Sequence, residues 1–357
     1  MVRSKSEPPS NPPDAAPPER MFIGAREVAE RAGVSRSAVS RVFTPGASVS
    51  DKTRRRVLEA AAELGYHVNH LARGLMSRQS GIVCLIVADL DSPQQARLTR
   101  ALVNRLQNAG KVVMVLTTDG RGKSAEALLR QSLNYRADGT VVISGSPAQS
   151  VVQTCLDSGQ RIVLINRDDR IAGPDNLRLD NDAVAKGALH HFMRAGCHRL
   201  ALVTTETPTP SLAARERAFL ALAQASGKEV TLVREGALAS YDTGAAAARK
   251  LFASHNPPDA VFCVVDLVAC GLMDVARREF GLRVPEDVSI VGCDNIKQSG
   301  WLSYELTTFD QPVDEMAEKA AALLCAERTS PSAPVTILIK PTLIWRRSVR
   351  LPHHTDG

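Results

Sequence analysis

The feature that most constrains the fold is an alternation of apolar, strand-like runs and helix-like segments that begins after Gly81 and continues for about 260 residues. Strands separated by helices of about 10–15 residues form βαβ units, so the sequence predicts an α/β fold with mainly parallel sheets. The predicted strands are Ile82–Ala88, Val112–Thr117, Gly139–Ile143, Arg161–Ile165, Leu200–Val203, Val230–Val233, Ala260–Val265 and Val288–Val291. The predicted helices between them include Arg97–Asn108, Ala125–Leu133, Lys186–Arg194, Leu212–Gln224, Thr243–Phe252 and Val268–Phe280.

These strands divide near residue 166 into two groups, which predicts two doubly wound lobes. With 357 residues, the chain is long enough for two or three packed units. Ligands bind such sheets at the carboxyl ends of the strands, so a cleft between the lobes is the expected binding site.

Ahead of the strands, the segment Ala25–Phe43 (AREVAERAGVSRSAVSRVF) has the spacing of two short helices joined by a tight turn. Gly33 can take a positive φ in that turn, and Ser35 is suited to cap the second helix. The apolar positions of the two helices are Val28, Ala29, Ala32, Val39 and Val42. This is the arrangement of a helix-turn-helix at about residues 25–44, in which the second helix enters the major groove of DNA. A generic helical hairpin could show the same apolar spacing.

The outer face of the second helix distinguishes these two interpretations. It carries polar side chains that can contact DNA, namely Ser35, Arg36, Ser37, Ser40 and Arg41. Arg pairs bidentately with guanine, and Ser bonds to base edges or phosphates. Residues 20–80 also contain eleven Lys and Arg against five Asp and Glu, which equals the net charge of +6 of the whole chain. A basic segment on a neutral body is typical of a polyanion-binding module, although charge alone fits a solvated helix face equally well.

Two further stretches follow this segment. A helix is predicted from a cap at Ser50 to Gly65, and its run Arg54–Arg56 could either reach phosphates or form a solvated face. The stretch Asn69–Met76 (NHLARGLM) has leucines at helical spacing, but eight residues cannot hold a helix alone in water. A helix here would therefore form on a partner, and its leucines suit insertion into a DNA base step.

Residues 24–345, some 90% of the chain, resemble the lactose repressor family of bacterial regulators. The motifs that carry the resemblance are EVAERAGVSRSAVSRVF, VSDKTRRRVLEAAAELGYHVNHLARGL, VSIVGCDN and LTTFDQP. The resemblance implies base-reading roles for Arg36, Ser37, Ser40 and Arg41. It also implies that Asn69–Leu75 is a hinge helix that contacts DNA through Asn69, Arg73 and Leu75, with Leu75 as the minor-groove wedge. Members of the family bind palindromic operators as dimers.

The chain departs from the family pattern at three positions near DNA. Ala38 replaces the usual Thr of the recognition helix, Thr44 replaces the Asn that follows it, and Val68 replaces the Pro before the hinge. From the resemblance, we expect the first two changes to alter operator preference and the third to loosen the hinge helix.

The resemblance also implies a body like that of type I periplasmic binding proteins, in which two lobes close on a small molecule. Asp294 follows an apolar strand and should project into the cleft, where the matching family residue contacts the effector. Arg215 matches a family Arg that faces the cleft, and Ser211 precedes it at the same helix entry. An Asp and an Arg in one cleft can bind hydroxyls or an anionic group, although they could instead form a structural ion pair.

The sequence offers further candidate effector residues. Asp266 lies where the family usually has Asn-Asp, and the Asn is replaced here by Val265. Gln94 and Gln95 occupy the place of a family motif with two aromatic residues, which predicts a more polar effector than an aromatic sugar derivative or a purine. A surface role for one glutamine is an equal alternative. For Asp180, structural use is as well supported as ligand contact.

The sequence contains no motif of a hydrolase, a P-loop or a zinc protease, so we expect no catalytic residues, no metal and no cofactor. Adjacent His190 and His191 point about 100° apart on a helix and cannot ligate one ion from one face. The cysteines lack metal-site spacing and are expected to be buried free thiols, namely Cys84, Cys155, Cys197, Cys263, Cys270, Cys293 and Cys325. The start of the chain lacks a signal-like apolar run, and no stretch could span a membrane, so we expect a cytoplasmic protein that does not contact membranes.

The sequence therefore predicts a ligand-responsive transcription regulator, more specifically a repressor, that binds double-stranded operator DNA as a homodimer. Its effector would be a sugar, a sugar acid or a similar polar metabolite. A solute-binding protein of an uptake system is the main alternative, but it requires export and does not explain residues 25–76. The expected domains are a Pro-rich disordered tail (1–20), a helix-turn-helix domain (21–68), a hinge helix and linker (69–80), an effector-binding and dimerisation domain (81–347) with crossovers near 166 and 293–310, and a tail (348–357).

Overall fold

A computed structural model describes residues 23–44, 46–67, 80–118, 124–143, 147–167, 172–326 and 333–351. The chain divides into two compact units, residues 1–78 and 79–357, which we call the head and the body. The predicted tail at 1–20 and the predicted hinge helix at 69–76, with Asn69, Arg73 and Leu75, lie outside the described residues. Their proposed roles therefore stay predictions.

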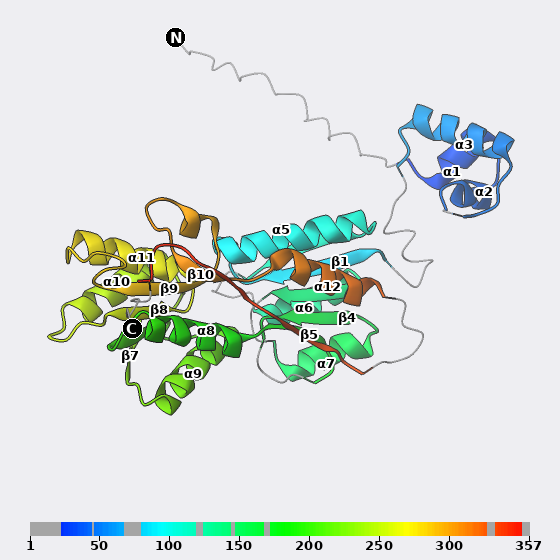
Figure 1. The fold of residues 1–357 in the computed structure, drawn as a ribbon. Coiled ribbons are helices and arrows are strands. Elements are labelled where there is room, and N and C mark those ends of the chain that lie inside the picture. The colour runs from blue at the N-terminus through cyan, green and yellow to red at the C-terminus, as the bar shows by residue number, and fades with distance from the viewer. Residues whose placement is uncertain are drawn as a thin grey trace, which may run out of the picture. The chain divides into compact units, whose positions relative to one another are not determined.

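The head contains three helices, α1 (Ala25–Ala32), α2 (Arg36–Val42) and α3 (Asp51–Leu64) (Figure 1). Gly33 ends α1 in the left-handed conformation with φ +61°, and Val34 N–H donates to the Ala29 carbonyl at 3.0 Å. A side chain at this φ would be strained, so the glycine sets the turn between α1 and α2. The small apolar core of the head comprises Val28, Ala29, Ala32, Val39, Val42, Val57, Ala60 and Ala61. It contains all the apolar positions predicted for α1 and α2.

The first lobe of the body is built on a six-stranded sheet with the strand order β11-β5-β4-β3-β1-β2. All neighbouring strands in it are parallel. Helices α5 (Pro93–Asn108) and α12 (Val313–Cys325) pack together on one face, and α6 (Ala125–Asn134) and α7 (Gln149–Asp157) cover the other (Figure 1). The strands are β1 (Ile82–Val87), β2 (Val112–Thr117), β3 (Gly139–Ile143), β4 (Arg161–Ile165), β5 (Asp175–Leu179) and β11 (Thr336–Ile339).

The second lobe repeats this architecture with the strand order β12-β10-β9-β8-β6-β7. Its strands are parallel except for β12, which is antiparallel to β10. Helices α8 (Asn181–Arg194) and α9 (Pro210–Ala225) pack on one face, and α10 (Tyr241–Phe252) and α11 (Asp266–Arg278) pack on the other. The strands are β6 (Leu200–Thr204), β7 (Val230–Arg234), β8 (Ala260–Cys263), β9 (Ser289–Asp294), β10 (Thr307–Asp310) and β12 (Thr342–Ile344), and a short 3-10 helix, η1, spans Lys297–Gly300.

The two-lobed α/β fold predicted from the sequence is confirmed, with corrections to its connections. The first passage between the lobes was predicted near residue 166, but β5 still joins the first sheet, so the chain crosses after Leu179. In the described residues, the chain crosses back to the first lobe after β10 and returns to the second lobe after β11. The predicted tail from residue 348 is also wrong at its start. Val349 is buried, and the Ser348 hydroxyl donates to the Ile290 carbonyl at 2.6 Å, so these residues belong to the second lobe.

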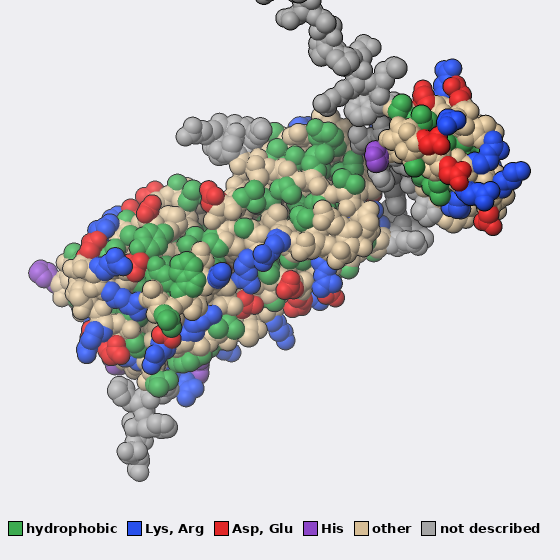
Figure 2. Space-filling model, turned by 90° about the horizontal axis from the view of Figure 1, so that it is seen from above, with side chains coloured by type: hydrophobic (Ala, Val, Ile, Leu, Met, Phe, Trp, Pro, Cys, Tyr) green, Lys and Arg blue, Asp and Glu red, His purple; other side chains and the backbone are tan. Residues whose placement is uncertain are grey.

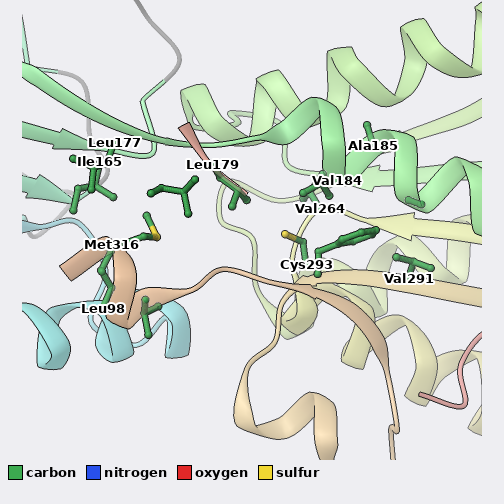
Figure 3. Close-up of a cluster of buried hydrophobic side chains, with 14 of the residues drawn as sticks. Leu98, Ile165, Leu177, Leu179, Val184, Ala185, Val264, Val291, Cys293 and Met316 are labelled. Carbon is green, nitrogen blue, oxygen red and sulfur yellow. The ribbon is translucent and has the colours of Figure 1, made fainter. Parts of the chain in front are cut away.

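One continuous hydrophobic core runs through both lobes (Figure 3). Leu179, at the end of β5, and Val184, on α8, lie between the side chains of the two sheets. In the first lobe, Met316 of α12 packs near Leu98 of α5. Because apolar side chains fill the junction between the two lobes, the lobes share one core there and are not separate globules.

Helices α10 and α11 cross with their backbones in close contact. Gly271 lies against the backbone of α10, and a Cβ at this position would overlap the carbonyl oxygen of Tyr241. Gly244 makes the reciprocal approach to the Val268 carbonyl. Each glycine thus permits a backbone-to-backbone distance that a side chain would prevent.

We expect Gly271→Ala to lower the free energy of unfolding of the body by about 3 kcal/mol, because the two helices must move apart against a packed core. Guanidinium denaturation of the purified protein would measure the change. The control Arg217→Ala, at an exposed position on α9, should change the free energy by less than about 0.5 kcal/mol. Equal stability of the two variants would contradict the close crossing.

Candidate functional site

The second helix of the head, α2, presents its polar side chains to the surface. Arg36, Ser37, Ser40 and Arg41 are exposed, while Val39 and Val42 on the opposite side are buried. Ser35 has a different role, because its hydroxyl caps α2 by accepting from Ala38 N–H at 3.2 Å. The structure thus brings four of the five predicted α2 residues onto one accessible face and places the fifth at its edge.

The arginine run of α3 divides between structural and exposed positions. Arg54 donates to the Val42 carbonyl at 3.3 Å and so satisfies the carboxyl end of α2. Arg55 lies 4.0 Å from Glu59 one turn further along α3, and Arg56 is exposed. Figure 2 shows Lys and Arg side chains gathered along one side of the head. The sequence left open whether this run reaches phosphates or forms a solvated face. Arg54 instead makes a structural contact, and both interpretations still fit the exposed Arg56.

The body contains a cavity of about 460 Å³ at the carboxyl ends of strands from both sheets. Residues that directly follow β1, β2, β4, β6 and β10 contribute to its wall, as do the last residues of β3 and β9. This is the edge where ligands bind to doubly wound sheets. Its polar lining residues are Asp89, Ser92, Gln94, Gln95, Thr118, Asn166, Thr205, Thr207, Thr209, Ser211, Arg215, Asp294 and Gln311.

Arg215 and Ser211 enter the cavity from the first turns of α9. The Arg215 Nε donates to Asn181 Oδ1 at 3.1 Å, and its Nη1 donates to the Val264 carbonyl. Asn181 also donates to the Ser211 hydroxyl at 3.3 Å. Among the described contacts, no salt bridge joins Arg215 to Asp294, so the structural ion pair considered from the sequence is not formed.

Asp294, the last residue of β9, is nearly buried in the cavity wall. Its Oδ1 accepts a hydrogen bond from Gln311 Nε2 at 2.5 Å. Burial raises the pKa of this carboxyl to about 8, although Arg215 opposes the rise. Nearby Asp266 adds to the rise, while the Gln311 hydrogen bond and Arg97 oppose it. A hydrogen bond to a carboxyl in this environment is stronger than one in water, because few water molecules compete for it.

Gln94 and Gln95 both line the cavity, at the amino end of α5. The Gln94 side-chain amide donates to Gln311 Oε1 at 3.3 Å, and Asn166 Nδ2 donates to the same oxygen at 2.9 Å. Gln95 Oε1 instead accepts from Asp89 N–H at 3.2 Å. Gln311 therefore joins side chains of the first lobe to Asp294 of the second.

Asp266 does not line the cavity, unlike its neighbours Val265 and Leu267. It is fully buried, and its two oxygens accept from Ile296 N–H at 3.0 Å and from the Thr308 hydroxyl at 2.5 Å. Burial raises its pKa to about 6. This position favours a structural role over the effector contact predicted from the sequence. Asp180 is likewise structural, since it caps α8 through Ala183 N–H at 2.9 Å.

Sequence reasoning missed several polar cavity residues, among them Asn166, Thr205 and Gln311. Asn166 follows β4 with φ +56°, Thr205 follows β6, and Gln311 follows β10. The buried Thr205 hydroxyl and Asn166 Oδ1 have no hydrogen-bond partner, so a ligand could satisfy both. Their signal in the sequence is a polar residue directly after an apolar strand, which the segment LTTFDQ around β10 shows only weakly.

Comparison with known proteins identifies both units. Residues 25–69 match the model of the lacI family of bacterial regulatory proteins, and residues 189–349 match a periplasmic binding protein-like domain. The chain combines a DNA-binding head of the lacI family with a periplasmic binding protein-like body. It is accordingly a DNA-binding transcription regulator with a ligand-binding body.

Individual lacI-family relatives span nearly the whole chain. The transcriptional repressor PurR of Erwinia tasmaniensis is 29% identical over 333 residues, which is 91% of this chain and 96% of that protein. The ribose operon repressor of Bacillus subtilis is 28% identical over 326 residues, covering 91% and 98%. The crystal structure of the lac repressor dimer bound to operator and the anti-inducer ONPF has a TM-score of 0.82 at 21% identity, covering 92% of this chain and 99% of that one, which shows the shared fold.

Three further expectations concern groups outside the cavity. Within the described ranges, no helix is long and apolar enough to cross a membrane, and no cluster of three His, Cys, Asp or Glu residues could hold a metal ion. Six of the seven cysteines are buried free thiols, but Cys325 is exposed, contrary to expectation. His190 is exposed, whereas His191 packs edge-on against Trp345 with ring centroids 5.0 Å apart.

We expect Asp294 to make the stability of the body depend on pH between about 4 and 8. Its pKa is higher in the folded protein than in the unfolded chain, so the unfolded state binds fewer protons in this window and stability falls as pH rises. Arg215, Arg97 and Asp266 are the charged groups that modify it. Asp294→Asn keeps the neutral form and should remove this part of the slope, as measured by denaturation at successive pH values. Parallel curves for the variant and the unmodified protein would contradict the raised pKa.

Proposed function

We propose that this chain is an effector-responsive repressor that binds a palindromic operator as a homodimer through α2 of each head. The observation that carries the proposal is the presence, in one chain, of an exposed polar recognition helix and a polar cavity between two lobes. The relatives named as repressors, and the lac repressor dimer bound to operator, support the direction of the response and the dimeric state. A protein that acts on chromosomal DNA in this way would work in the bacterial cytoplasm.

Within this proposal, Arg36, Ser37, Ser40 and Arg41 contact DNA. Their exposure on one face of α2 lets them reach base edges while Val39 and Val42 hold the helix against the head. Ser35 contributes mainly as the cap of α2, and a backbone phosphate could still bind near its edge. The cap matters for DNA binding because it fixes where the recognition helix begins.

The cavity supports a small, polar, non-aromatic effector such as a sugar or a sugar acid. Asp294 accepts hydrogen bonds, while Arg215 and the amides of Gln94 and Asn166 offer donors. Thr205 adds an unpartnered hydroxyl. Among the described residues, the lining contains no aromatic ring on which a purine or an aromatic glycoside could stack. One relative is named for a ribose operon, which agrees with a carbohydrate effector.

Effector control would act through the relative position of the two lobes. A ligand shifts this equilibrium by its difference in affinity for the closed and open arrangements. In a dimer, that shift changes the spacing of the two heads on the operator. The proposal therefore assigns regulation to the cavity and sequence reading to α2.

We expect Arg41→Ala to weaken binding to the native operator by about 1–3 kcal/mol and to relax preference at one base pair, because Arg41 would read a base edge. Mobility-shift assays with a set of operator variants would measure both effects. Arg217→Ala on α9 is the control and should leave binding unchanged. If Arg41→Ala weakens binding to all variants equally, Arg41 contacts a phosphate instead of a base.

We expect a thermal-shift screen of sugars, sugar acids and sugar phosphates to identify a stabilising compound, since a ligand at about 100 times its Kd adds about 2.7 kcal/mol. Asp294→Ala should abolish this stabilisation and the release from operator DNA, while operator binding without ligand persists. A response that survives in Asp294→Ala would exclude Asp294 from the effector site. An unmodified protein with no preference for its upstream DNA over random duplex would contradict the proposed function itself.

A further inference from the structure

The turn that presents Asp294 to the cavity has an unusual backbone. Asp294 has φ +131° and Asn295 has φ +51°, and neither residue is glycine. Such conformations cost free energy and persist where surrounding contacts hold them in place. The contacts around this turn therefore decide whether the Asp294 carboxyl faces the cavity.

Contacts within the second lobe hold one side of the turn. Asn295 Nδ2 donates to Asp310 Oδ1 at 3.0 Å, and Arg346 Nη2 donates to Asn295 Oδ1 at 2.7 Å. The next residue, Ile296, donates its N–H to the buried Asp266 at 3.0 Å. These bonds fix the Asn295 side chain and the backbone after it. They do not involve the carbonyl oxygens of Asp294 and Asn295, which bond to a different residue.

That partner is Arg97, which comes from the other lobe. Arg97 lies on α5, and its Nη1 donates to the Asn295 carbonyl at 2.7 Å and to the Asp294 carbonyl at 3.4 Å. Its Nη2 lies 3.9 Å from Asp310 Oδ1, and its side chain is 30% exposed. α5 packs on the first-lobe sheet and on α12, so Arg97 moves with the first lobe. Hydrogen bonds from a charged donor to backbone carbonyls are among the stronger ones.

Arg97 is not a lining residue of the cavity. It therefore differs from Gln94 and Gln311, which link the same two lobes but border the space that a ligand would fill. Any influence of Arg97 on an effector must pass through the turn that it holds. Arg97 would consequently act as a positioning residue.

We propose that Arg97 is an inter-lobe latch that holds the Asp294–Asn295 turn in its strained conformation when the lobes are closed, so that lobe closure and presentation of the Asp294 carboxyl occur together. Separation of the lobes withdraws the guanidinium from both carbonyls and lets the turn relax. A ligand bound to Asp294 favours the latched arrangement by the same coupling. This inference rests on the proposed effector site at Asp294, but the positions of the lobes can be measured without any effector.

The test measures the distance between the lobes in the full-length protein without ligand. Spin labels are attached to Cys325, which is exposed at the end of α12, and to Ser226→Cys, at the end of α9 in the second lobe. The other six cysteines are buried. Mixing with excess unlabelled protein removes distances between subunits. The variants are Arg97→Met, Arg97→Lys and, as the matched control, Arg100→Met at an exposed position on the same helix.

Arg97→Met should shift the distance distribution toward more open lobes, and Arg97→Lys, which can still donate to a carbonyl, should restore part of the closed population. Arg100→Met should match the parent. Hydrogen exchange of a peptide containing residues 294–300 should become about ten-fold faster in Arg97→Met, the effect expected for loss of a charge-assisted hydrogen bond. Exchange in β8 should stay unchanged, which distinguishes local release of the turn from general destabilisation.

Unchanged distances and unchanged exchange in Arg97→Met would overturn the proposal. So would equal opening in Arg97→Lys and Arg97→Met, because loss of packing would then explain the effect. If Arg97→Met fails to fold, the Arg97→Lys distribution decides: a partly opened population with faster exchange of the turn than in the parent supports the latch, and parent-like values of both overturn it. None of these outcomes depends on operator binding, whose failure in the unmodified protein would contradict the proposed function instead.

Discussion

The buried carboxylate of Asp266 is the interaction on which the geometry of the cavity depends. A carboxylate removed from water is costly unless its oxygens are hydrogen-bonded. Here Thr308 of β10 and the backbone of Ile296 supply those bonds, and they tie α11 to the segment that follows β9. Gly292 allows this arrangement, because a Cβ there would overlap Asp266 Oδ1. The position of Asp294 is thus fixed by a group that the cavity itself does not contain.

The sequence predicted the architecture better than the connections. Long apolar runs such as Ile82–Ala88 identified the buried strands, because a strand covered on both faces contains few polar residues. Strands β5, β10, β11 and β12 were missed because they have only three to five residues, and their polar and half-exposed positions resemble those of loops. β11 pairs with β5 and β12 pairs with β10, each far earlier in the chain, so tertiary context, which local patterns do not contain, stabilises these strands.

The candidate site was predictable in part for the same reason. Asp294 and Arg215 were identified from motifs, and both line the cavity. Asp266 was assigned to the cavity because it matches the family's Asn-Asp position, but the helix that begins there turns its side chain into the second lobe. Gln311 was missed because its importance comes from three partners that lie far apart in the sequence, Gln94, Asn166 and Asp294. On the head, by contrast, helical periodicity alone separated the buried and exposed faces of α2.

The latch described at the Asp294–Asn295 turn uses main-chain acceptors on one side. Arg97 bonds to the carbonyl oxygens of these residues and not to their side chains. Every residue type carries that carbonyl, so the side chain at position 294 can change without removing an acceptor from the latch. Ligand chemistry and lobe closure are thereby separable in evolution and in design. A lineage could acquire a new inducer by altering the cavity lining while it inherits the same mechanical coupling.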